Sequence, residues 1–279
     1  MDWTAAQKRL RGPLFAPIAP AIARLDPARW PTHQDLTALA AGIETSRGIP
    51  IRFVPPRTQR DEGRPYYEQH IAESGEVETR PGNWHDLFNA LAWIAFPKAK
   101  AAINAQHAAM LAEGGEEEAR RRSPARDALT LFDEGGVAVA SSSPAMLRLI
   151  VDFQWKALFW ERREELAQKV RFVAFGHSLF EKALEPFEGV VAKTVFVPVS
   201  DFFAMLPPES QVAEVDALLA AHFANRSRFT SPKAMAPLPA FGVPGWHPGT
   251  VSESYYDCPD HFRRKPGEKG GKGSDPISP

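Results

Sequence analysis

The residues from Asn83 to His107 constrain the fold more than any other stretch, because helix-start signals coincide there with a dense run of aromatic and reactive side chains. Asn83 is a good N-cap, and Asp86 stands at the third helical position, where a carboxylate adds to the capping chemistry. Pro97 suits the first position of a second helix. This stretch therefore predicts two helices that meet at Phe96–Pro97.

The first of these helices has two chemically different faces. At about 100° per residue, one wide arc collects apolar side chains, namely Trp84, Leu87, Phe88, Leu91, Ile94 and Ala95. The opposite arc carries His85, Asp86, Asn89 and Trp93. Solvated helix faces are normally rich in Lys, Glu and Gln, so this second set is typical of a pocket lining. In the second helix Lys100, Asn104 and His107 recur on one side, and we expect both polar faces to open on one cleft.

The same residues also have a purely structural interpretation. In it Asp86 is only a capping residue, and His85 and His107 are hydrogen-bonded histidines at a seam between helices. Trp84, Phe88 and Trp93 are then simply part of the core. Polar residues that face an interior are retained for structural reasons about as readily as for chemistry, so both interpretations stay open.

Composition narrows the class of protein. A chain of 279 residues with 44% apolar residues can bury a substantial core, as one large domain or two small ones. The formal net charge of −1 gives no overall field toward nucleic acid or anionic lipid. The single cysteine, Cys258, excludes an internal disulfide framework and a multi-cysteine zinc site, which fits a reducing compartment.

No segment has the pattern of a membrane span or a signal peptide. The first residues lack the charged-then-apolar order of a signal peptide. The most apolar run, residues 146–160, is interrupted by Arg148, Asp152, Gln154 and Lys156. We therefore expect a soluble, cytoplasmic protein without a membrane partner. Nucleic acid is not favoured as a partner either, because the few basic residues of the tail are offset by Glu268 and Asp275.

The fold class predicted from the whole chain is α+β, with a helical core at 83–112 and 143–169 and short flanking strands. The N-terminal part predicts a helix at about 33–45 and strands at 51–54, 66–71 and 76–80. The charged run at 113–122 is interpreted as a surface insertion. Residues 128–132 and 137–140, joined through Gly135 and Gly136, predict a β-hairpin with Asp127, Asp133 and Glu134 at its ends and tip.

The pattern of the C-terminal half predicts both helices and strands. A long helix is expected at 143–169, then a strand at 170–175, a short helix from Gly176 and a strand at 190–197. This order hints at a parallel strand pair. A final helix at 209–224 precedes an extended arm at 226–264 that wraps the body, and residues 265–279 are expected to be a disordered tail. Residues 1–264 are interpreted as one domain.

A divalent metal ion is the cofactor that the candidate residues favour. His177 and Glu181 are four residues apart on a short helix, so both can reach one ion. His85, His107, Asp127 and Asp133 add the nitrogen and carboxylate ligands that zinc, manganese or iron would take. Histidine and glutamate at this spacing are common by chance, however, and no metalloprotease, phosphate-loop or EF-hand motif is present. The metal hypothesis therefore depends on geometry assembled by folding.

Several other motifs are explained more simply by structure. Arg126 and Asp127 can form an ion pair at the start of the hairpin, and Asp133-Glu134 beside glycines is typical of a turn. No Gly-x-Ser-x-Gly motif supports a serine hydrolase. Cys258 has no nearby helix start to lower its pKa, so a nucleophilic role is not favoured.

Motifs spread over much of the chain resemble a known family. They are Asn83–Leu91 with Phe96-Pro97 and Lys100, Arg126–Glu134, Gly176-His177 with Glu181, Pro244–Trp246, Tyr256-Asp257 and Phe262-Arg263. This pattern, from about Pro50 to Arg264, resembles the bacterial domain of unknown function 3025 family, although Arg264-Lys265 departs from it. The resemblance implies a single-domain bacterial protein. The resemblance implies no activity, cofactor or partner for this chain.

The favoured function is an enzyme for metal-assisted or general acid–base hydrolysis. Its catalytic residues would be His85, Asp86, Asn89, Asp127 and His177. Its substrate contacts would be Trp93, Lys100, Asn104 and Arg126. Its metal ligands would be His85, Asp127, His177 and Glu181. The alternative is a non-catalytic binding or scaffold protein, in which these residues form a buried network and the arm at 226–264 docks a partner, either a small molecule or a protein.

Overall fold

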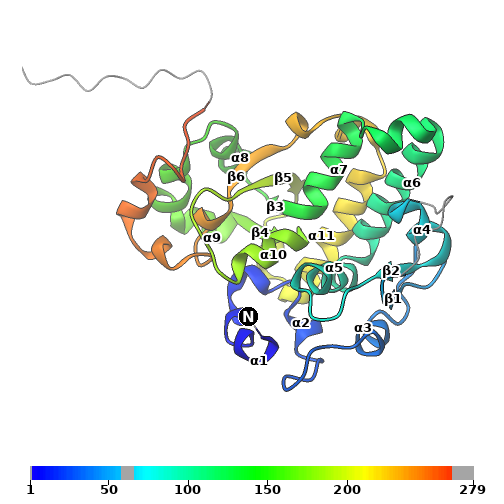
Figure 1. Ribbon diagram of the computed structural model, residues 1–279. Coiled ribbons are helices and arrows are strands. Elements are labelled where there is room, and N and C mark those ends of the chain that lie inside the picture. The colour runs from blue at the N-terminus through cyan, green and yellow to red at the C-terminus, as the bar shows by residue number, and fades with distance from the viewer. Residues whose placement is uncertain (1, 58–65, 266–279) are drawn as a thin grey trace, which may run out of the picture.

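A computed structural model describes residues 2–57 and 66–265 of the chain (Figure 1). It has the mixed α+β fold class expected from the sequence, with two small sheets among many helices. The predicted disordered tail lies outside the described residues except for Lys265, whose Nζ is 2.9 Å from Asp152 Oδ1.

The larger sheet has four strands in the order β4-β3-β5-β6. Their bounds are β3 (Gly136–Ser141), β4 (Val170–Ala174), β5 (Val191–Pro198) and β6 (Ala236–Pro239). β3 is parallel to β5 and antiparallel to β4. The expected parallel pair of the strands at 170–175 and 190–197 is therefore wrong, because the fully buried β3 lies between them and hydrogen-bonds to both.

The two faces of this sheet pack against two separate hydrophobic clusters. Val137 and Val139 of β3 belong to one cluster, and the alternate residues Ala138 and Ala140 belong to the other. The alanine face packs against α6 (Pro97–Arg120), α7 (Pro124–Gly135) and α11 (Pro208–Phe223) (Figure 1). Phe132 of α7 anchors that layer, with its ring centroid 5.0 Å from Phe175 and 4.9 Å from Phe223.

The valine face packs against the N-terminal segment and several shorter helices. The remaining helices are α1 (Trp3–Ala6), α2 (Ala19–Ile22), α3 (His33–Leu39), α4 (Tyr67–Ser74), α5 (Trp84–Ala95), α8 (Pro144–Val151), α9 (Arg163–Lys169) and α10 (His177–Ala183). The smaller sheet pairs β1 (Arg52–Val54) in parallel with β2 (Glu76–Glu78). None of the helices in the described parts of the chain has the length and apolar character to cross a bilayer.

The helix pair at the centre of the sequence forms as predicted. Asn83 Oδ1 accepts a hydrogen bond of 3.0 Å from the backbone N–H of Asp86, which caps α5. The backbone of Phe96 leaves the helical region, and Pro97 starts α6 at its first position. Local capping and proline signals therefore placed both helices correctly.

Two predicted strands are helices in the structure. Residues 67–71 lie in α4, with Tyr66 as its N-cap, and the helix ends before Gly75, which has a positive φ of 71°. Residues 128–132 lie in α7, so the predicted β-hairpin is wrong. Ser123 caps α7 by accepting from the backbone N–H of Arg126, and Pro124 occupies its first turn. Helical spacing of Ala128, Leu129 and Phe132 then buries one face of α7.

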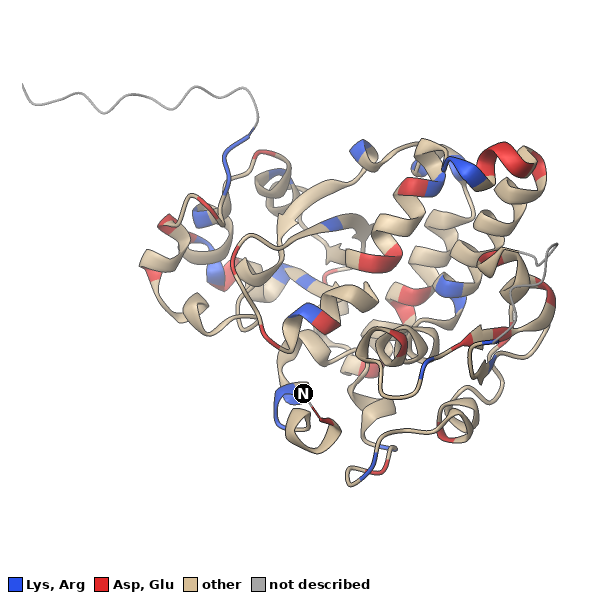
Figure 2. Ribbon diagram, in the orientation of Figure 1, with Lys and Arg blue, Asp and Glu red and all other residues tan. Residues whose placement is uncertain are grey.

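Three longer segments also differ from their predictions. The helix expected at 143–169 is broken after α8, where Phe153 has a φ of 57°, and it resumes through a π-helical turn at Ala157–Glu161. The charged run at 113–122 mostly continues α6 past a kink at Gly115, at the outer end of that helix (Figure 2). The arm at 226–264 contains β6 and several 3₁₀ turns, so it completes one edge of the sheet.

Candidate functional site

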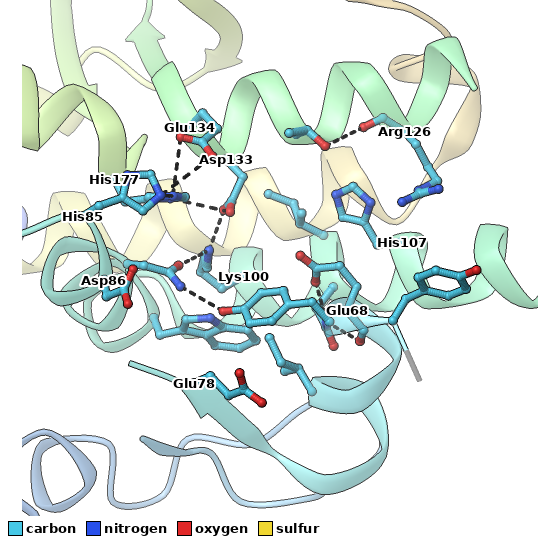
Figure 3. A pocket seen from close by; sticks show the side chains of 18 of the residues that line it. Glu68, Glu78, His85, Asp86, Lys100, His107, Arg126, Asp133, Glu134 and His177 are labelled. Atoms are coloured by element: carbon cyan, nitrogen blue, oxygen red, sulfur yellow. Dashed lines mark hydrogen bonds and ion pairs between the residues drawn. The ribbon is translucent and has the colours of Figure 1, made fainter. Parts of the chain in front are cut away.

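Side chains from five helices line one cavity of about 550 Å³ (Figure 3). The helices are α4, α5, α6, α7 and α10, with β2 and its flanks closing one side. The polar lining residues include Glu68, His85, Asp86, Asn89, Lys100, Asn104, His107, Arg126, Asp133, Glu134 and His177. Both polar helix faces proposed from the sequence, on α5 and α6, therefore open on the same cavity.

Two histidines and a glutamate converge at one end of this cavity. His85 in the first turn of α5 and His177 at the start of α10 bring their Nε2 atoms to 3.1 Å, with their rings nearly perpendicular. Glu134 at the end of α7 places Oε2 3.6 Å from His177 Nε2 and Oε1 3.9 Å from His85 Nε2. We call these three residues the His–Glu–His cluster.

A further carboxylate lies behind each imidazole. Glu181 Oε2 is 3.2 Å from Nδ1 of His85, so that nitrogen can donate to it. Asp133 Oδ2 is 3.6 Å from Nδ1 of His177, which is a buried atom without a hydrogen-bond partner among the described residues. Metal-binding histidines commonly have such a carboxylate behind the ring nitrogen that does not bind the ion.

Lys100 and Asn89 join the cluster to the middle of the cavity. The Lys100 ammonium, buried at 4% exposure, lies 2.6 Å from Asp133 Oδ1 and donates to Asn89 Oδ1 at 2.9 Å. It also sits 5.5 Å from the ring centroid of Trp93. Asn89 donates in turn to the hydroxyl of Tyr67 at 3.3 Å. Asn89 thus positions Lys100, and both groups of its amide are already hydrogen-bonded.

Burial shifts the pKa values of His177 and Glu134. Burial lowers the pKa of His177 to about 4, against the opposing effect of Asp133. Burial raises the pKa of Glu134. Burial also acts to raise the pKa of Asp133, but the charge of Lys100 and that of His177 outweigh it, and the pKa of Asp133 is lowered. His177 is therefore neutral at pH 7, the form whose nitrogen lone pair can bind a metal ion.

Gly176 explains why His177 lies so close to Glu134. A Cβ atom at Gly176 would lie 2.4 Å from the carbonyl oxygen of Glu134 and 2.5 Å from the backbone nitrogen of Gly136. The amide of Gly176 also donates to the Gly136 carbonyl at 3.0 Å. Only glycine permits this approach of two backbones, and it joins the start of α10 to the end of α7.

The His–Glu–His cluster has the geometry to hold a metal ion. One ligand atom from each of the three residues can be chosen so that all lie within 4.8 Å of one another. With metal–nitrogen distances of about 2.05 Å, the 3.1 Å between the two Nε2 atoms corresponds to a ligand–metal–ligand angle of about 100°. That angle lies between the ideal octahedral and tetrahedral values, so the two imidazoles could bind one ion.

Most residues proposed from the sequence line the cavity, but they occupy different parts of it. His85 and His177 meet in the cluster, with Glu181 behind His85 rather than between the two rings. Asp86 lines the cavity too, yet both its oxygens are taken by Arg80, at 2.7–2.8 Å. Trp93, Lys100, Asn104 and Arg126 line the middle and the far end.

Asp127 does not join this site, which corrects its expected place among the ligands. It lies outside the cavity lining, in the first turn of α7. The prediction placed Asp127 at a strand end of a hairpin and Asp133 and Glu134 at its tip, whereas all three residues lie in α7. In a helix, seven residues span about 10 Å, so Asp127 is two turns away from Glu134.

Asp133 and Glu134 were assigned to a turn because two glycines follow them. The signal that could have placed them was the start of α7, Ser123-Pro124, followed by apolar residues at helical spacing. Tyr67 and Glu68 are not among the predicted site residues, because the sequence pattern of their segment predicts a strand whereas the structure has α4 there. No local signal identifies Gly176 as a contact between backbones.

Comparison with known proteins gives a family but no function. A family model described as a protein of unknown function, DUF3025, matches residues 51–266. The chain belongs to this family. The resemblance expected from the motifs is thus confirmed, and the matched range contains the whole His–Glu–His cluster. No curated protein and no solved structure matches the chain.

Proposed function

We propose that the chain is a metal-dependent hydrolase whose divalent ion is bound by Nε2 of His85, Nε2 of His177 and the carboxylate of Glu134. The observation that carries the proposal is the facing pair of Nε2 atoms, 3.1 Å apart, with a carboxylate behind each ring. If each Nδ1 carries the proton and faces its carboxylate, both Nε2 atoms keep a lone pair and neither can donate to the other. Two acceptor nitrogens at this distance repel each other unless both bind one cation.

The ligand set favours hydrolytic chemistry. Two histidines and one carboxylate leave at least one coordination position open for water in a catalytic site. An ion held by His85, His177 and Glu134 would lower the pKa of a bound water and so would supply the nucleophile for hydrolysis near neutral pH. Zinc, manganese and iron accept such nitrogen and oxygen ligands.

Lys100 has a positioning role in this proposal. Its ammonium is buried against Asp133, which keeps that carboxylate ionised behind His177. An ionised Asp133 favours the tautomer of His177 that carries its proton on Nδ1 and presents the lone pair of Nε2 to the ion. Loss of Lys100 should therefore weaken metal binding without removing a ligand.

Metal analysis of the purified full-length chain tests the proposal. After incubation with zinc, manganese or iron(II) and removal of the excess, we expect one ion per chain by mass spectrometry. His85→Ala, His177→Ala and Glu134→Gln should each lower affinity by at least about 100-fold in calorimetric titration. His33→Ala is the matched control, since His33 bonds to the Thr79 carbonyl outside the cavity.

Hydrolysis is then measured with chromogenic ester, amide and phosphoester substrates. Turnover that needs the ion and is lost in the three ligand variants supports the proposal. No stoichiometric binding of any of the three ions would overturn the metal-dependent mechanism.

A non-catalytic protein is the second candidate. The same 3.1 Å distance suits one imidazole donating a hydrogen bond to the other, and the Lys100–Asp133–Asn89 contacts form a connected buried network. In that case His85→Ala and His177→Ala would lower stability while wild type bound no ion and turned over no substrate.

A further inference from the structure

The cavity has a second polar end, away from the His–Glu–His cluster. It is formed by Asn104 and His107 on α6 and by Arg126 at the start of α7. Figure 3 shows His107 and Arg126 at this end of the cavity. Their exposed fractions are 2%, 4% and 7%, so all three are more than nine-tenths buried although they line a cavity. We call these residues the far-end triad.

Each member of the far-end triad has a buried polar atom without a partner. Asn104 Oδ1, His107 Nδ1 and Arg126 Nε make no hydrogen bond to any residue in the described part of the chain. A buried polar atom left unpaired is unfavourable, so three of them in side chains that line one cavity favour a ligand that pairs with them.

The remaining atoms of two of these side chains are held firmly. The Asn104 amide donates to the Glu68 carbonyl at 2.9 Å and to Glu68 Oε2 at 2.7 Å, which fixes its oxygen as the free atom. Arg126 donates through a terminal nitrogen to the Glu118 backbone carbonyl, which leaves Nε–H free. The triad therefore presents one fixed acceptor and one fixed donor.

This combination selects the chemistry of the ligand. A carboxylate or phosphate could accept from Arg126, but it would meet the Asn104 oxygen and the Glu68 carboxylate, both of which repel an anion. The charge of Arg126 is moreover already balanced by Glu118, 3.4 Å away. An ammonium group has no acceptor for the Arg126 N–H. A neutral amide, with a carbonyl beside an N–H, satisfies both atoms, and His107 Nδ1 can serve either group through its tautomer.

We propose that the far-end triad binds a neutral amide group of a small molecule, with the carbonyl on Arg126 Nε–H and the N–H on Asn104 Oδ1. Ile71, Ile103 and Leu111 line the cavity as well and offer an apolar surface to the body of the ligand. The inference that this ligand is a substrate rests on the proposed hydrolase function. The inference that the triad binds an amide does not depend on that function.

The binding experiment uses saturation-transfer NMR on the full-length chain with three small probes of similar size. N-methylacetamide carries the amide, acetate carries an anion, and methyl acetate accepts but does not donate. We expect N-methylacetamide to bind at least about fivefold more tightly than either other probe, the factor that one net hydrogen bond contributes. N-acetylglucosamine, glycylglycine and uracil then show which source of the amide fits.

Variants assign the binding to the triad. Arg126→Lys keeps the charge near Glu118 but removes Nε–H, and it should weaken N-methylacetamide binding about fivefold. His107→Leu gives a second test if Arg126→Lys does not fold. Arg120→Lys, at an exposed arginine paired with Glu116, is the matched control and should change nothing.

The outcomes separate this inference from the metal site. Amide binding should persist in a chelator, so a chain that binds no ion can still confirm the amide subsite. Equal or tighter binding of acetate, binding unchanged in Arg126→Lys, or no binding of N-methylacetamide because water alone fills the triad would each overturn the inference.

Discussion

Replacing Gly176 by alanine should push the start of α10, which carries His177, away from the end of α7, which carries Glu134. The added Cβ would lie 2.4 Å from the Glu134 carbonyl oxygen and 2.5 Å from the Gly136 nitrogen, both backbone atoms that cannot rotate away. Ordinary contacts begin near 3.4 Å, so α10 must move from the end of α7 by roughly 1 Å. Gly176 has a φ of −65°, which alanine adopts readily, so the whole effect is steric.

The displacement should lower both the folding stability and the metal affinity. Overpacking of this kind costs about 1–3 kcal/mol of folding free energy. Metal sites tolerate errors of only about 0.2 Å in ligand distance, so a displacement of roughly 1 Å at His177 should weaken metal binding at least about tenfold. Gly135→Ala is the matched control: no atom lies within 4 Å of its Cβ position, and it ends α7, where alanine should stabilise by about 0.5–1 kcal/mol.

Urea unfolding followed by circular dichroism gives the free energies of unfolding of wild type and of both variants in the presence of a chelator. Zinc titration calorimetry then gives the affinities. We expect Gly176→Ala to lose both stability and zinc affinity, and Gly135→Ala to lose neither. A Gly176→Ala variant as stable as Gly135→Ala, with unchanged zinc affinity, would refute the argument that this backbone contact positions His177.

Three further results are expected. Lys100→Met leaves the buried Asp133 charge without its partner and should cost about 3–5 kcal/mol, much of which the double variant with Asp133→Leu should recover; urea unfolding that shows no recovery would contradict this. Because burial lowers the pKa of His177 from 6.5 to about 4, the unfolded chain binds a proton that the folded chain excludes. Stability is therefore unaffected above about pH 6.5 and falls by about 3 kcal/mol as the pH drops to about 4, and His177→Gln with chelator present should flatten this dependence. Asn83→Ala removes the cap on the Asp86 amide and should cost about 1 kcal/mol in the same unfolding assay, whereas no change would mean that solvent caps α5 equally well.

The polar half of the site that lies on α5 and α6 could be predicted from the sequence. Asn83 and Pro97 are start signals that act within one helical turn, and the helical period gives the spacing of His85 and Asn89 on α5 and of Lys100 and Asn104 on α6. The half on α7 could not be predicted in the same way. Gly135-Gly136 suggested a hairpin turn, while the competing Ser123-Pro124 start signal lies a full helix length earlier. The domain limit at residue 264 stays a prediction.

The amino-acid sequence by itself determined where the central helices begin, which of their faces are polar, and that no metal site in the chain can use more than one cysteine. Only the tertiary structure decided that Glu134 rather than Asp127 stands beside the two histidines. The physical reason is the range of the interactions. Caps and helical periodicity act over about four residues, whereas the approach of His177 to Glu134 depends on two backbones, distant in the sequence, that pack at Gly176 where β3 pairs with β4.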